Sequence, residues 1–380
     1  MLEATLGVDI GSVSTKGVVI DHAGQVLAQG YLWTEGHPVN AVKKLLGVLK
    51  EQLPKPIKIT GVGTTGSARK LIGTMLGANM VKNEITAHAV GTLSKYPHVQ
   101  TILEIGGQDS KIILIRGGIV TDYAMNTLCA AGTGAFLAAQ AGRLGVPMED
   151  MGKLALEARH PVKIAARCAV FAESDMVHKA QAGHRKEDLI AGLCAAVVLN
   201  YLSDVGQGKE ITPPVIFQGG VSKNSGVVEA FKRQTGFEIL VDDSSHLAGA
   251  LGCAILARPG AGHSKPRLNV GSDALHSKPR PKVGSDAPHS EPRPKVGSDA
   301  PHSKRLLRAG GDAHHIGDSR GLRHTKQDNM QEFSFEIAGT DFQTAGRECD
   351  KCPNCCEVMS AYRDGVLVDT WGNRCAGGEV

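Results

Sequence analysis

The sequence predicts an α/β protein built from two similar halves, followed by a repetitive linker and a small cysteine-rich segment. Three observations predict this organisation. Strand and helix signals alternate from residue 1 to about residue 260. Within this range a short polar motif occurs twice, and beyond it the composition changes abruptly. We therefore expect a first lobe over residues 1–95, a second lobe over 96–260, a linker over 261–330 and a cysteine-rich segment over 331–380.

The duplicated motif predicts two β-hairpins with polar tips. Its first copy spans residues 9–16 and reads DIGSVSTK, and its second copy spans residues 104–111 and reads EIGGQDSK. When the copies are aligned, acid matches acid, glycine matches glycine and lysine matches lysine. Each copy is typical of a buried strand, a glycine-bearing turn and the start of a second strand. Either copy alone is compatible with an ordinary β-hairpin, but two copies in register favour a shared function.

Two such tips facing each other across a cleft are suited to hold a polyphosphate and its metal. The glycines let backbone N–H groups approach phosphate oxygens closely. Asp9 or Glu104 would hold Mg²⁺ through water, because this cation prefers oxygen ligands and keeps part of its water shell.

The other elements follow from the pattern of apolar residues, turn residues and glycines. In the first half we expect a strand over residues 26–33, an amphipathic helix over 39–53, a strand over 57–62 and a helix opening at Gly66. In the second half we expect strands over 101–105, 111–115, 119–124 and 215–217, a long helix over 186–203 and a last helix over 246–256.

The composition is that of a globular enzyme. Of the 380 residues, 42% are hydrophobic and 21% are charged, which is enough for one or two domains with cores. The formal net charge is only +4, and much of the basic character lies late in the chain, so the predicted lobes show no nucleic-acid footprint. No apolar run reaches the roughly 18 residues of a membrane span, and the N-terminus lacks the features of a secretion signal. We expect a cytoplasmic protein.

The predicted linker carries a repeat with a period of 13 residues, starting at His263, His276 and His289. The repeat is rich in proline, glycine, serine and charged residues, so it lacks the apolar side chains of a core. We interpret it as a disordered spacer. Loose metal binding by its histidines is the alternative.

The chain has nine cysteines, which in a cytoplasmic protein favour metal or redox chemistry over disulfides. Cys129 and Cys168 each precede a predicted helix. At a helix N-terminus the exposed N–H groups and the helix dipole favour a thiolate. The alternative is that both are small buried hydrophobic residues, the usual fate of a free cysteine. Cys194 and Cys253 lie within apolar helices and are assigned to core packing.

Six strings of residues occur in a characteristic order: DIGSVSTKG, NEITAHA, EIGGQDSK, CAAGTGAF, RCAVFAESDM and FQGGVSKN. In these strings the chain closely resembles the ATP-dependent activators (component A) of 2-hydroxyacyl-CoA dehydratases, within the wider family of benzoyl-CoA reductase ATPase subunits. The resemblance covers residues 5–258, and the two cysteine-bearing strings are its most specific part. It implies a two-lobed actin/hexokinase-like (ribonuclease H-like) duplicated fold.

The resemblance implies that Cys129 and Cys168 ligate a [4Fe–4S] cluster. Such a cluster normally takes four thiolates, and one chain supplies two in matching motifs. A two-fold homodimer would bring both cysteines of each subunit to one axis, so that one cluster is shared by the dimer.

The resemblance also assigns the nucleotide site. Asp109 or Gln108 would orient the attacking water, because positioning and electrostatics dominate phosphoryl transfer. Glu104 stands where the family commonly has Asp, so it keeps the charge and adds a methylene group. The implied catalytic residues are Asp9, Glu104, Gln108 and Asp109, and the implied ATP-contacting residues are Gly11, Ser12, Ser14, Thr15, Lys16, Gly106, Gly107, Lys111, Gly132, Gly134, Gly219, Gly220 and Asn224.

Two interpretations of Glu84 and His88, in the string NEITAHA, are open. They are either residues that couple the nucleotide site to the rest of the protein, or simply charged and polar residues at the start of a helix.

The activity implied by the resemblance is ATP-gated electron transfer. Reduced ferredoxin or flavodoxin would reduce the cluster, and ATP would change the angle between the lobes and open the dimer interface. One electron would then pass to a 2-hydroxyacyl-CoA dehydratase or a benzoyl-CoA-type reductase. A switch of this kind requires that ATP bind two conformations with different affinities. The alternatives are a sugar or N-acetylhexosamine kinase of the same fold and, ranked last, a zinc-binding adaptor.

The C-terminal cysteines have the spacing of metal ligands: Cys349, Cys352, Cys355 and Cys356, followed by Cys375. The segment resembles a cysteine-rich region of the longer, fused members of the same group. That resemblance makes Cys349, Cys352, Cys356 and Cys375 candidate ligands of a second cluster or of zinc. A remnant without metal is the remaining alternative.

Overall fold

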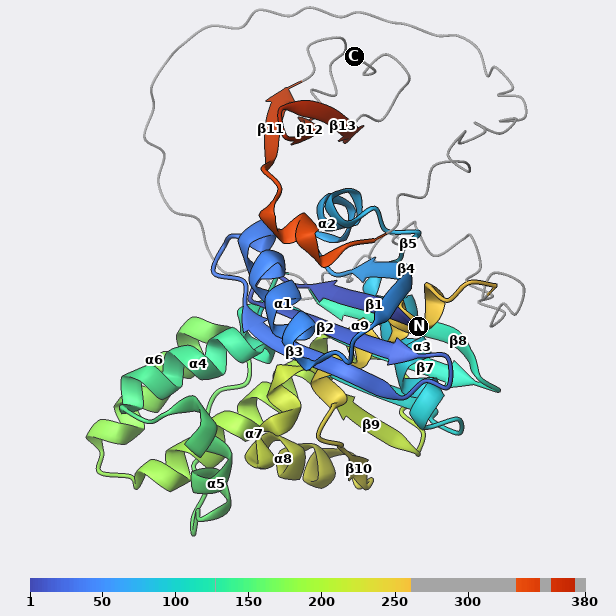
Figure 1. Ribbon diagram of the computed structural model, residues 1–380. Coiled ribbons are helices and arrows are strands. Elements are labelled where there is room, and N and C mark those ends of the chain that lie inside the picture. Colours follow the sequence, from blue (N-terminus) through green and yellow to red (C-terminus); the bar gives the residue numbers. More distant parts are fainter. Residues whose placement is uncertain (127, 261–332, 349–356, 373–380) are drawn as a thin grey trace, which may run out of the picture. The chain divides into compact units, whose positions relative to one another are not determined.

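The computed structural model describes residues 1–126, 128–260, 333–348 and 357–372 (Figure 1). The first lobe is built on a five-stranded sheet in the order β3-β2-β1-β4-β5. Strands β1, β2 and β3 form an antiparallel meander, and β4 and β5 run parallel to β1. The strands are β1 (Leu2–Ile10), β2 (Ser14–Asp21), β3 (Val26–Trp33), β4 (Ile57–Thr65) and β5 (Met80–Val81).

The second lobe repeats this plan. Its sheet has the order β10-β9-β6-β7-β8, with β6, β7 and β8 as the meander and β9 and β10 parallel to β6. The strands are β6 (Thr101–Ile105), β7 (Ser110–Arg116), β8 (Ile119–Asn126), β9 (Val215–Gln218) and β10 (Ile239–Leu240). Because both sheets share one topology, the predicted two-lobed actin/hexokinase-like duplicated fold is confirmed.

The strand register shows that the two hairpins are equivalent residue by residue. Asp9 lies opposite Lys16 in the β1–β2 ladder, and Glu104 lies opposite Lys111 in the β6–β7 ladder. The duplication seen in the sequence therefore reflects the same backbone pairing in both lobes.

Helices cover the sheets with their apolar faces. Helix α1 (Pro38–Gln52) begins with a proline, whose fixed φ suits a first helical turn, and it buries Val42, Leu45, Leu46 and Leu49 at helical spacing. Helix α2 (Arg69–Leu76) follows Gly66 after a short turn. The expected helix over residues 246–256 is divided, because Ser245–Leu247 forms a 3₁₀ turn (η4) before α9 (Ala248–Leu256).

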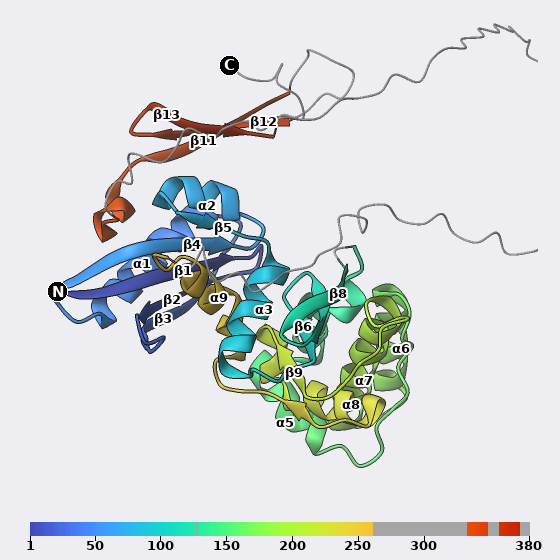
Figure 2. The same cartoon turned by 90° about the vertical axis from the view of Figure 1, so that its right-hand side faces the viewer.

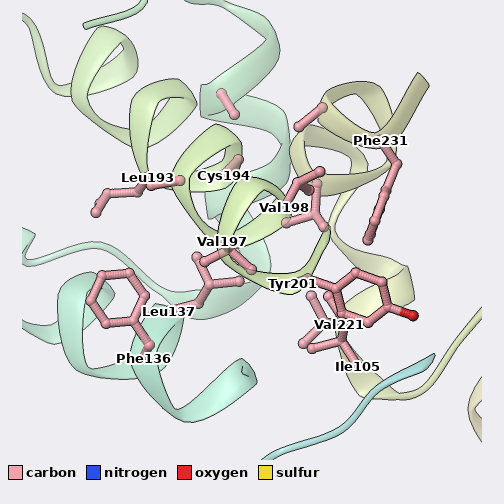
Figure 3. Close-up of a cluster of buried hydrophobic side chains, with 14 of the residues drawn as sticks. Ile105, Phe136, Leu137, Leu193, Cys194, Val197, Val198, Tyr201, Val221 and Phe231 are labelled. Carbon is pink, nitrogen blue, oxygen red and sulfur yellow. The ribbon is translucent and has the colours of Figure 1, made fainter. Parts of the chain in front are cut away.

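Helix α7 (Lys186–Asp204) forms the centre of the second lobe's core (Figure 3). It packs against α4 (Gly134–Leu144), α5 (Met151–Leu156), α6 (Ala169–Gln181) and α8 (Ser225–Thr235). Tyr201 of α7 meets Phe231 edge to face with ring centroids 5.3 Å apart, and its hydroxyl donates to the Lys111 carbonyl at 2.6 Å. The fold thus ties the core directly to the second hairpin.

The buried thiols belong to the core, as expected. Cys194 is 1% exposed and Cys253 is 0% exposed. Burial raises the pKa of the Cys194 thiol to about 12 and raises that of Cys253 as well. Neither thiol is suited to react at neutral pH.

Two helices cross between the lobes. Helix α3 (Glu84–Lys95) packs on the second sheet through Ala89 and its neighbours, whereas α9, from the far end of the second half, packs on the first sheet through Ala250 and Ala254 (Figure 2). Each of these helices therefore packs on the sheet of the other half of the chain: α3 precedes residue 96 and covers the second sheet, and α9 follows it and covers the first.

The crossing of α3 and α9 brings backbone against backbone. A Cβ added at Gly91 would lie 2.0 Å from the Ala248 carbonyl oxygen, and one at Gly252 would lie 1.8 Å from the Ala87 carbonyl oxygen. Only glycine permits such an approach.

The C-terminal segment forms a small antiparallel sheet of β11 (Phe342–Glu348), β12 (Glu357–Arg363) and β13 (Val366–Trp371), preceded by the 3₁₀ turn η6 (Phe335–Gly339). Phe342 and Ala361 are buried in the same apolar cluster as the leucines of α1. The Arg363 guanidinium donates to the Met75 carbonyl at the end of α2, at 2.8 Å. Among the described residues, no helix combines the length and apolar character that a membrane crossing requires.

Candidate functional site

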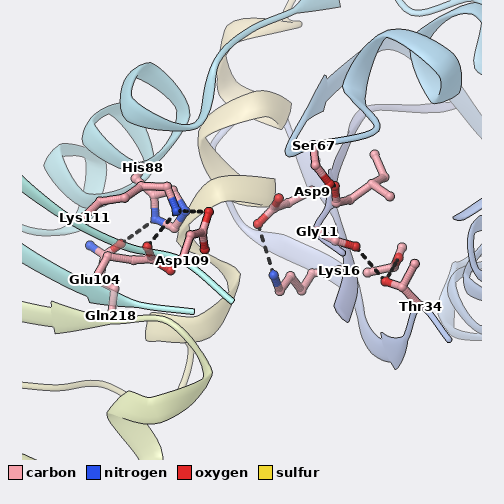
Figure 4. A network of polar contacts seen from close by, with 12 residues as sticks. Asp9, Gly11, Lys16, Thr34, Ser67, His88, Glu104, Asp109, Lys111 and Gln218 are labelled. Carbon is pink, nitrogen blue, oxygen red and sulfur yellow. Dashed lines mark hydrogen bonds and ion pairs between the residues drawn. The ribbon is translucent and has the colours of Figure 1, made fainter. Parts of the chain in front are cut away.

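The tips of the two hairpins line one pocket (Figure 4). In each tip the glycine N–H donates to a carbonyl across the turn at 2.9 Å: Gly11 to Ser14, and Gly106 to Asp109. The tips also meet, because a Cβ at Gly107 would lie 2.6 Å from the Val13 Cβ. The predicted residues that line the pocket are Asp9, Gly11, Ser12, Ser14, Lys16, Glu104, Gly106, Gly107, Gln108, Asp109 and Lys111.

Ion pairs hold the charged side chains of both hairpins. Lys16 Nζ lies 3.4 Å from Asp9 Oδ2, and Lys111 Nζ lies 2.9 Å from Glu104 Oε2 and 2.9 Å from Asp109 Oδ2. Burial would raise the pKa of Asp9, but the lysine charges outweigh burial and hold it below its ordinary value. Burial would lower the pKa of Lys111, but its two carboxylates raise it above its ordinary value. Asp9 and Lys111 are therefore charged at neutral pH.

The pocket carries an excess of negative charge. Four carboxylates line it, from Asp9, Glu84, Glu104 and Asp109, against the two lysines. A polyphosphate without a counterion would be repelled by this excess, and a divalent cation bound with it would offset the repulsion. Among the described residues, no group of three or more His, Cys, Asp and Glu side chains is arranged to hold a metal by itself. The carboxylate oxygens of Asp9 and Glu104 in the pocket are of the ligand type that Mg²⁺ prefers.

Several predicted residues support the turns from behind. Thr15 is fully buried and shares a 2.9 Å hydrogen bond with Thr34, whose hydroxyl donates to the Gly11 carbonyl at 2.8 Å. The Gly134 N–H, at the start of α4, donates to the Gly106 carbonyl at 2.9 Å. Gly219 has φ +86°, and a Cβ there would lie 2.9 Å from Glu104 Oε1. A larger residue at Gly219 would press on the acid of the second turn.

The remaining predicted contacts lie outside this pocket. Gly132 lies against the backbone of Tyr201, where a Cβ would be 3.3 Å from the Tyr201 nitrogen. Asn224 caps α8, with its Oδ1 accepting from the Val227 N–H at 3.1 Å. A Cβ added at Gly220 would lie 3.5 Å from the Tyr31 hydroxyl.

The pocket also includes residues that the sequence analysis did not assign to it: Val13, Gly66 and Ser67. Gly66 has φ +92°, and it ends β4 beside the first turn. The signal in the sequence was a strand followed by Gly-Ser ahead of a helix, the pattern of a loop that approaches a phosphate.

Glu84 and His88 both line the pocket. Glu84 is the first residue of α3 and lies 3.6 Å from Arg69. His88 lies one turn further along and is 5% exposed.

Cys129 and Cys168 are both exposed, so the alternative of buried hydrophobic residues is wrong for them. As expected, each lies at a helix start: Cys129 directly precedes the 3₁₀ turn η1 (Ala130–Gly132), and Cys168 directly precedes α6. Elements η1 and α6 contact each other. The Asn126 Oδ1 accepts from the Cys129 N–H at 2.9 Å and holds the loop in place.

Large apolar side chains are exposed beside these cysteines. Leu128 is 98% exposed, Val170 is 68% exposed and Phe171 is 64% exposed. These exposed apolar side chains are close in the chain to the two exposed thiols, Leu128 before Cys129 and Val170 and Phe171 after Cys168. The predicted ligands Cys349, Cys352, Cys356 and Cys375, and the histidine repeat, lie outside the described residues.

The duplicated sheets define a two-lobed fold of actin/hexokinase type, and the tips of its two hairpins line one polar pocket. The chain belongs to the BadF/BadG/BcrA/BcrD ATPase family, whose sequence pattern it matches over residues 6–257. The resemblance drawn from the six strings is thereby confirmed.

Known relatives of this chain include two dehydratase activators. The chain is 33% identical to the 2-hydroxyisocaproyl-CoA dehydratase activator of Clostridioides difficile, over 67% of this chain and 94% of that protein. It is 32% identical to the (R)-2-hydroxyglutaryl-CoA dehydratase activating ATPase of Acidaminococcus fermentans, over 67% of this chain and 96% of that protein. A solved structure of the Clostridium difficile activator with bound ADPNP covers 67% of this chain and 94% of its own length, with a TM-score of 0.61.

Proposed function

We propose that this chain is an ATP-hydrolysing iron–sulfur activator that passes one low-potential electron to a 2-hydroxyacyl-CoA dehydratase or a benzoyl-CoA-type reductase. The observation that carries the proposal is the coexistence of a polar pocket between the duplicated turns and two exposed cysteines on contacting elements. Family membership and the ADPNP bound to a relative support it. Reduced ferredoxin or flavodoxin is the proposed electron donor.

The two hairpin tips would bind the phosphates of ATP. Backbone N–H groups around Gly11 and Gly106 would donate to phosphate oxygens, and Lys16 and Lys111 would offset phosphate charge. Bound with ATP, Mg²⁺ would offset the excess negative charge of the pocket, with Asp9 and Glu104 held through water. Gln108 and Asp109 are proposed to face the terminal phosphate. Gly132, Gly134, Gly219, Gly220 and Asn224 are proposed for the second lobe's side of the nucleotide.

The cysteine pair fits a [4Fe–4S] cluster shared by a homodimer. Each chain exposes two thiols, Cys129 and Cys168, and such a cluster normally takes four. A two-fold interface would bring the four together and would bury the exposed side chains of Leu128 and Phe171. Bound there, the cluster would supply one-electron transfer at low potential. The N–H groups at the start of α6 would stabilise its negative charge.

Nucleotide binding would change the angle between the lobes at the crossing of α3 and α9. Each of these helices packs on one lobe's sheet, and their backbones touch at Gly91 and Gly252. A ligand that contacts both hairpin tips would favour one angle between the lobes, and the helix crossing would act as the pivot.

A metal site of the C-terminal cysteines is a separate proposal. Glu348, which ends β11, pairs with Glu357, which begins β12, and Met359 pairs with Trp371 near the end of β13. The described residues that flank the cysteine positions therefore lie at one end of the small sheet. We propose that Cys349, Cys352, Cys356 and Cys375 bind either an iron–sulfur cluster or zinc.

The deciding experiment measures iron and acid-labile sulfide per dimer, with EPR, on anaerobically purified full-length protein. The variants are Cys129→Ala, Cys168→Ala, and a protein in which the five C-terminal cysteines are replaced by serine. Cys194→Ala is the matched control, because this thiol is buried in the core. We expect one four-iron cluster per dimer to survive in the control and in the serine variant and to be lost in the other two. Its presence in Cys129→Ala and Cys168→Ala would refute the redox proposal. ATP-dependent phosphorylation of a sugar would favour the kinase alternative.

A further inference from the structure

His88 is a buried residue of the pocket, and its side chain is held by a hydrogen bond (Figure 4). Its Nδ1 lies 2.9 Å from Gln218 Oε1, at the end of β9. Gln218 pairs in turn with Glu104 across the β6–β9 ladder. The imidazole on α3 is therefore anchored to the strand that adjoins the second phosphate hairpin.

A chain of hydrogen bonds determines which ring nitrogen carries the proton. The Thr92 hydroxyl donates to the His88 carbonyl at 2.7 Å, so towards the Gln218 side chain it can only accept. The Gln218 amide nitrogen donates to the Thr92 oxygen, which leaves the Gln218 carbonyl oxygen facing the ring. Nδ1 must therefore donate its proton to Gln218, and in the neutral ring Nε2 is a free acceptor.

The free nitrogen lies close to the acid of the first hairpin. A Cβ added at Gly249 would lie 3.2 Å from His88 Nε2 and 2.8 Å from Asp9 Oδ2. This glycine of α9 leaves room between the two side chains. A positive charge that forms on the imidazole would be stabilised by the ionised Asp9 carboxylate.

The other ionisable side chains of the described pocket are engaged. Asp9 pairs with Lys16, and Glu104 and Asp109 both pair with Lys111. Glu84 pairs with Arg69. Gln108 can orient a water molecule but cannot take its proton.

We propose that His88 is a catalytic residue of ATP hydrolysis, where it orients the attacking water and accepts its proton at Nε2. This inference rests on the proposed ATPase function. The water oxygen forms a bond to the γ-phosphorus as the bond from that phosphorus to the β–γ bridging oxygen breaks. The electron pair leaves with ADP, the water proton moves to Nε2, and the imidazolium then releases it to solvent. Gln218 and Thr92 are positioning residues that hold the ring in the competent tautomer.

The test compares His88→Asn with the wild-type holoprotein in single-turnover ATP hydrolysis. The asparagine amide keeps a donor for Gln218 and removes the acceptor at Nε2. We expect the hydrolysis rate to fall by about 100-fold or more, the usual contribution of general acid–base catalysis. Affinity for ADPNP and iron content should stay at wild-type values. His98→Asn, at an exposed histidine just after α3, is the matched control and should hydrolyse ATP normally.

The pH profile separates a catalytic from a structural role. A base must be neutral to accept a proton, so the wild-type rate should fall on the acidic side, and His88→Asn should lose that limb. Asp9 on β1, Glu84 on α3, Glu104 on β6, and Lys16 and Lys111 on the hairpins also face the pocket. These charged groups remain in the variant, so the difference between the two profiles reports on His88.

Each outcome decides the proposal. A wild-type hydrolysis rate in His88→Asn overturns the role of His88 and leaves the proposed function intact. Absence of ATP hydrolysis in the wild type overturns both. If His88→Asn does not fold, Gln218→Leu decides, because it keeps the imidazole but removes its anchor. We expect a loss of about tenfold in that variant, and an unchanged rate and pH profile would overturn the proposal.

Discussion

The two hairpin tips have the same strand pairing but differ in their ion pairs and in the hydrogen bonds that support them. The first tip pairs one acid with one lysine at 3.4 Å, whereas the second places Lys111 between two acids at 2.9 Å each. A threonine side chain holds the first tip, and backbone N–H groups of α4 hold the second. The strand register is thus the same in both tips, whereas the ion pairs and the supporting hydrogen bonds differ.

Removal of the second tip's lysine should have the largest effect on stability. Lys111 is 3% exposed, so Lys111→Met would leave two carboxylates without their partner and should lower the free energy of unfolding by about 3–5 kcal/mol. Lys16→Met, at the partly exposed and longer ion pair, should cost clearly less. Denaturant unfolding of both variants measures the difference. Equal losses would show that the two tips are electrostatically equivalent.

The second largest loss of stability should follow from a methyl group added where α3 and α9 cross. In Gly252→Ala the new Cβ would overlap the Ala87 carbonyl of α3, and the forced separation of the helices should cost about 1–3 kcal/mol. Gly47→Ala is the matched control, because that glycine lies in α1 with nothing within 4 Å of its Cβ position. There the replacement should stabilise the helix by about 0.5–1 kcal/mol. The same sign for both variants would contradict a tight crossing.

Low pH should reduce the free energy of unfolding, because protonation of Asp9 removes its ion pair in the first tip. The folded-state pKa of Asp9 lies below its ordinary value of 3.8, so the unfolded chain binds its proton more readily than the folded chain does. The stability from this carboxylate is present above pH 3.8 and is lost as the pH falls through the folded-state pKa. Unfolding measured against pH should therefore show the wild type converging towards Asp9→Asn in acid. A constant difference between them across this range would exclude the linkage.

The smallest loss of stability should follow from removal of the Thr34 hydroxyl, which supports the first tip only. Thr34→Val removes the hydroxyl that donates to the Gly11 carbonyl and should lower the free energy of unfolding by about 1 kcal/mol. Binding of ADPNP should weaken, because the first turn is held less firmly. Thermal unfolding and nucleotide titration test both effects. A loss as large as that of Lys111→Met would mean that the hydroxyl supports more than this turn.

Strands and hairpins were predictable because their signals are local. The alternation of apolar residues placed β3 and β6 at their observed bounds, and the duplicated acid-to-lysine spacing matches the ladder register. The division of the last helix was missed. The 3₁₀ turn at Ser245–Leu247 packs against β2 and β9, which lie far away in the chain, and residue patterns do not encode those contacts.

The sequence predicted the two hairpin tips of the pocket but did not assign Gly66, Ser67 and His88 to its lining. The Gly66–Ser67 connection and His88 join the pocket through packing that spans the lobes. Gly132 lies against α7 and Asn224 caps α8, and residue patterns alone did not indicate these contacts. A residue type shows what a side chain can do, and its neighbours in space decide whether it does so at the site.

By itself, the sequence determined the duplication, the strand order within each hairpin, the family and the pair of cysteines at helix starts, because each depends on residues close together in the chain. The tertiary structure decided which helix covers which sheet, that Cys129 and Cys168 are exposed while Cys194 and Cys253 are buried, and that His88 faces Asp9. These facts depend on contacts between residues far apart in the chain. Such contacts are selected by the packing of whole elements rather than by any local pattern.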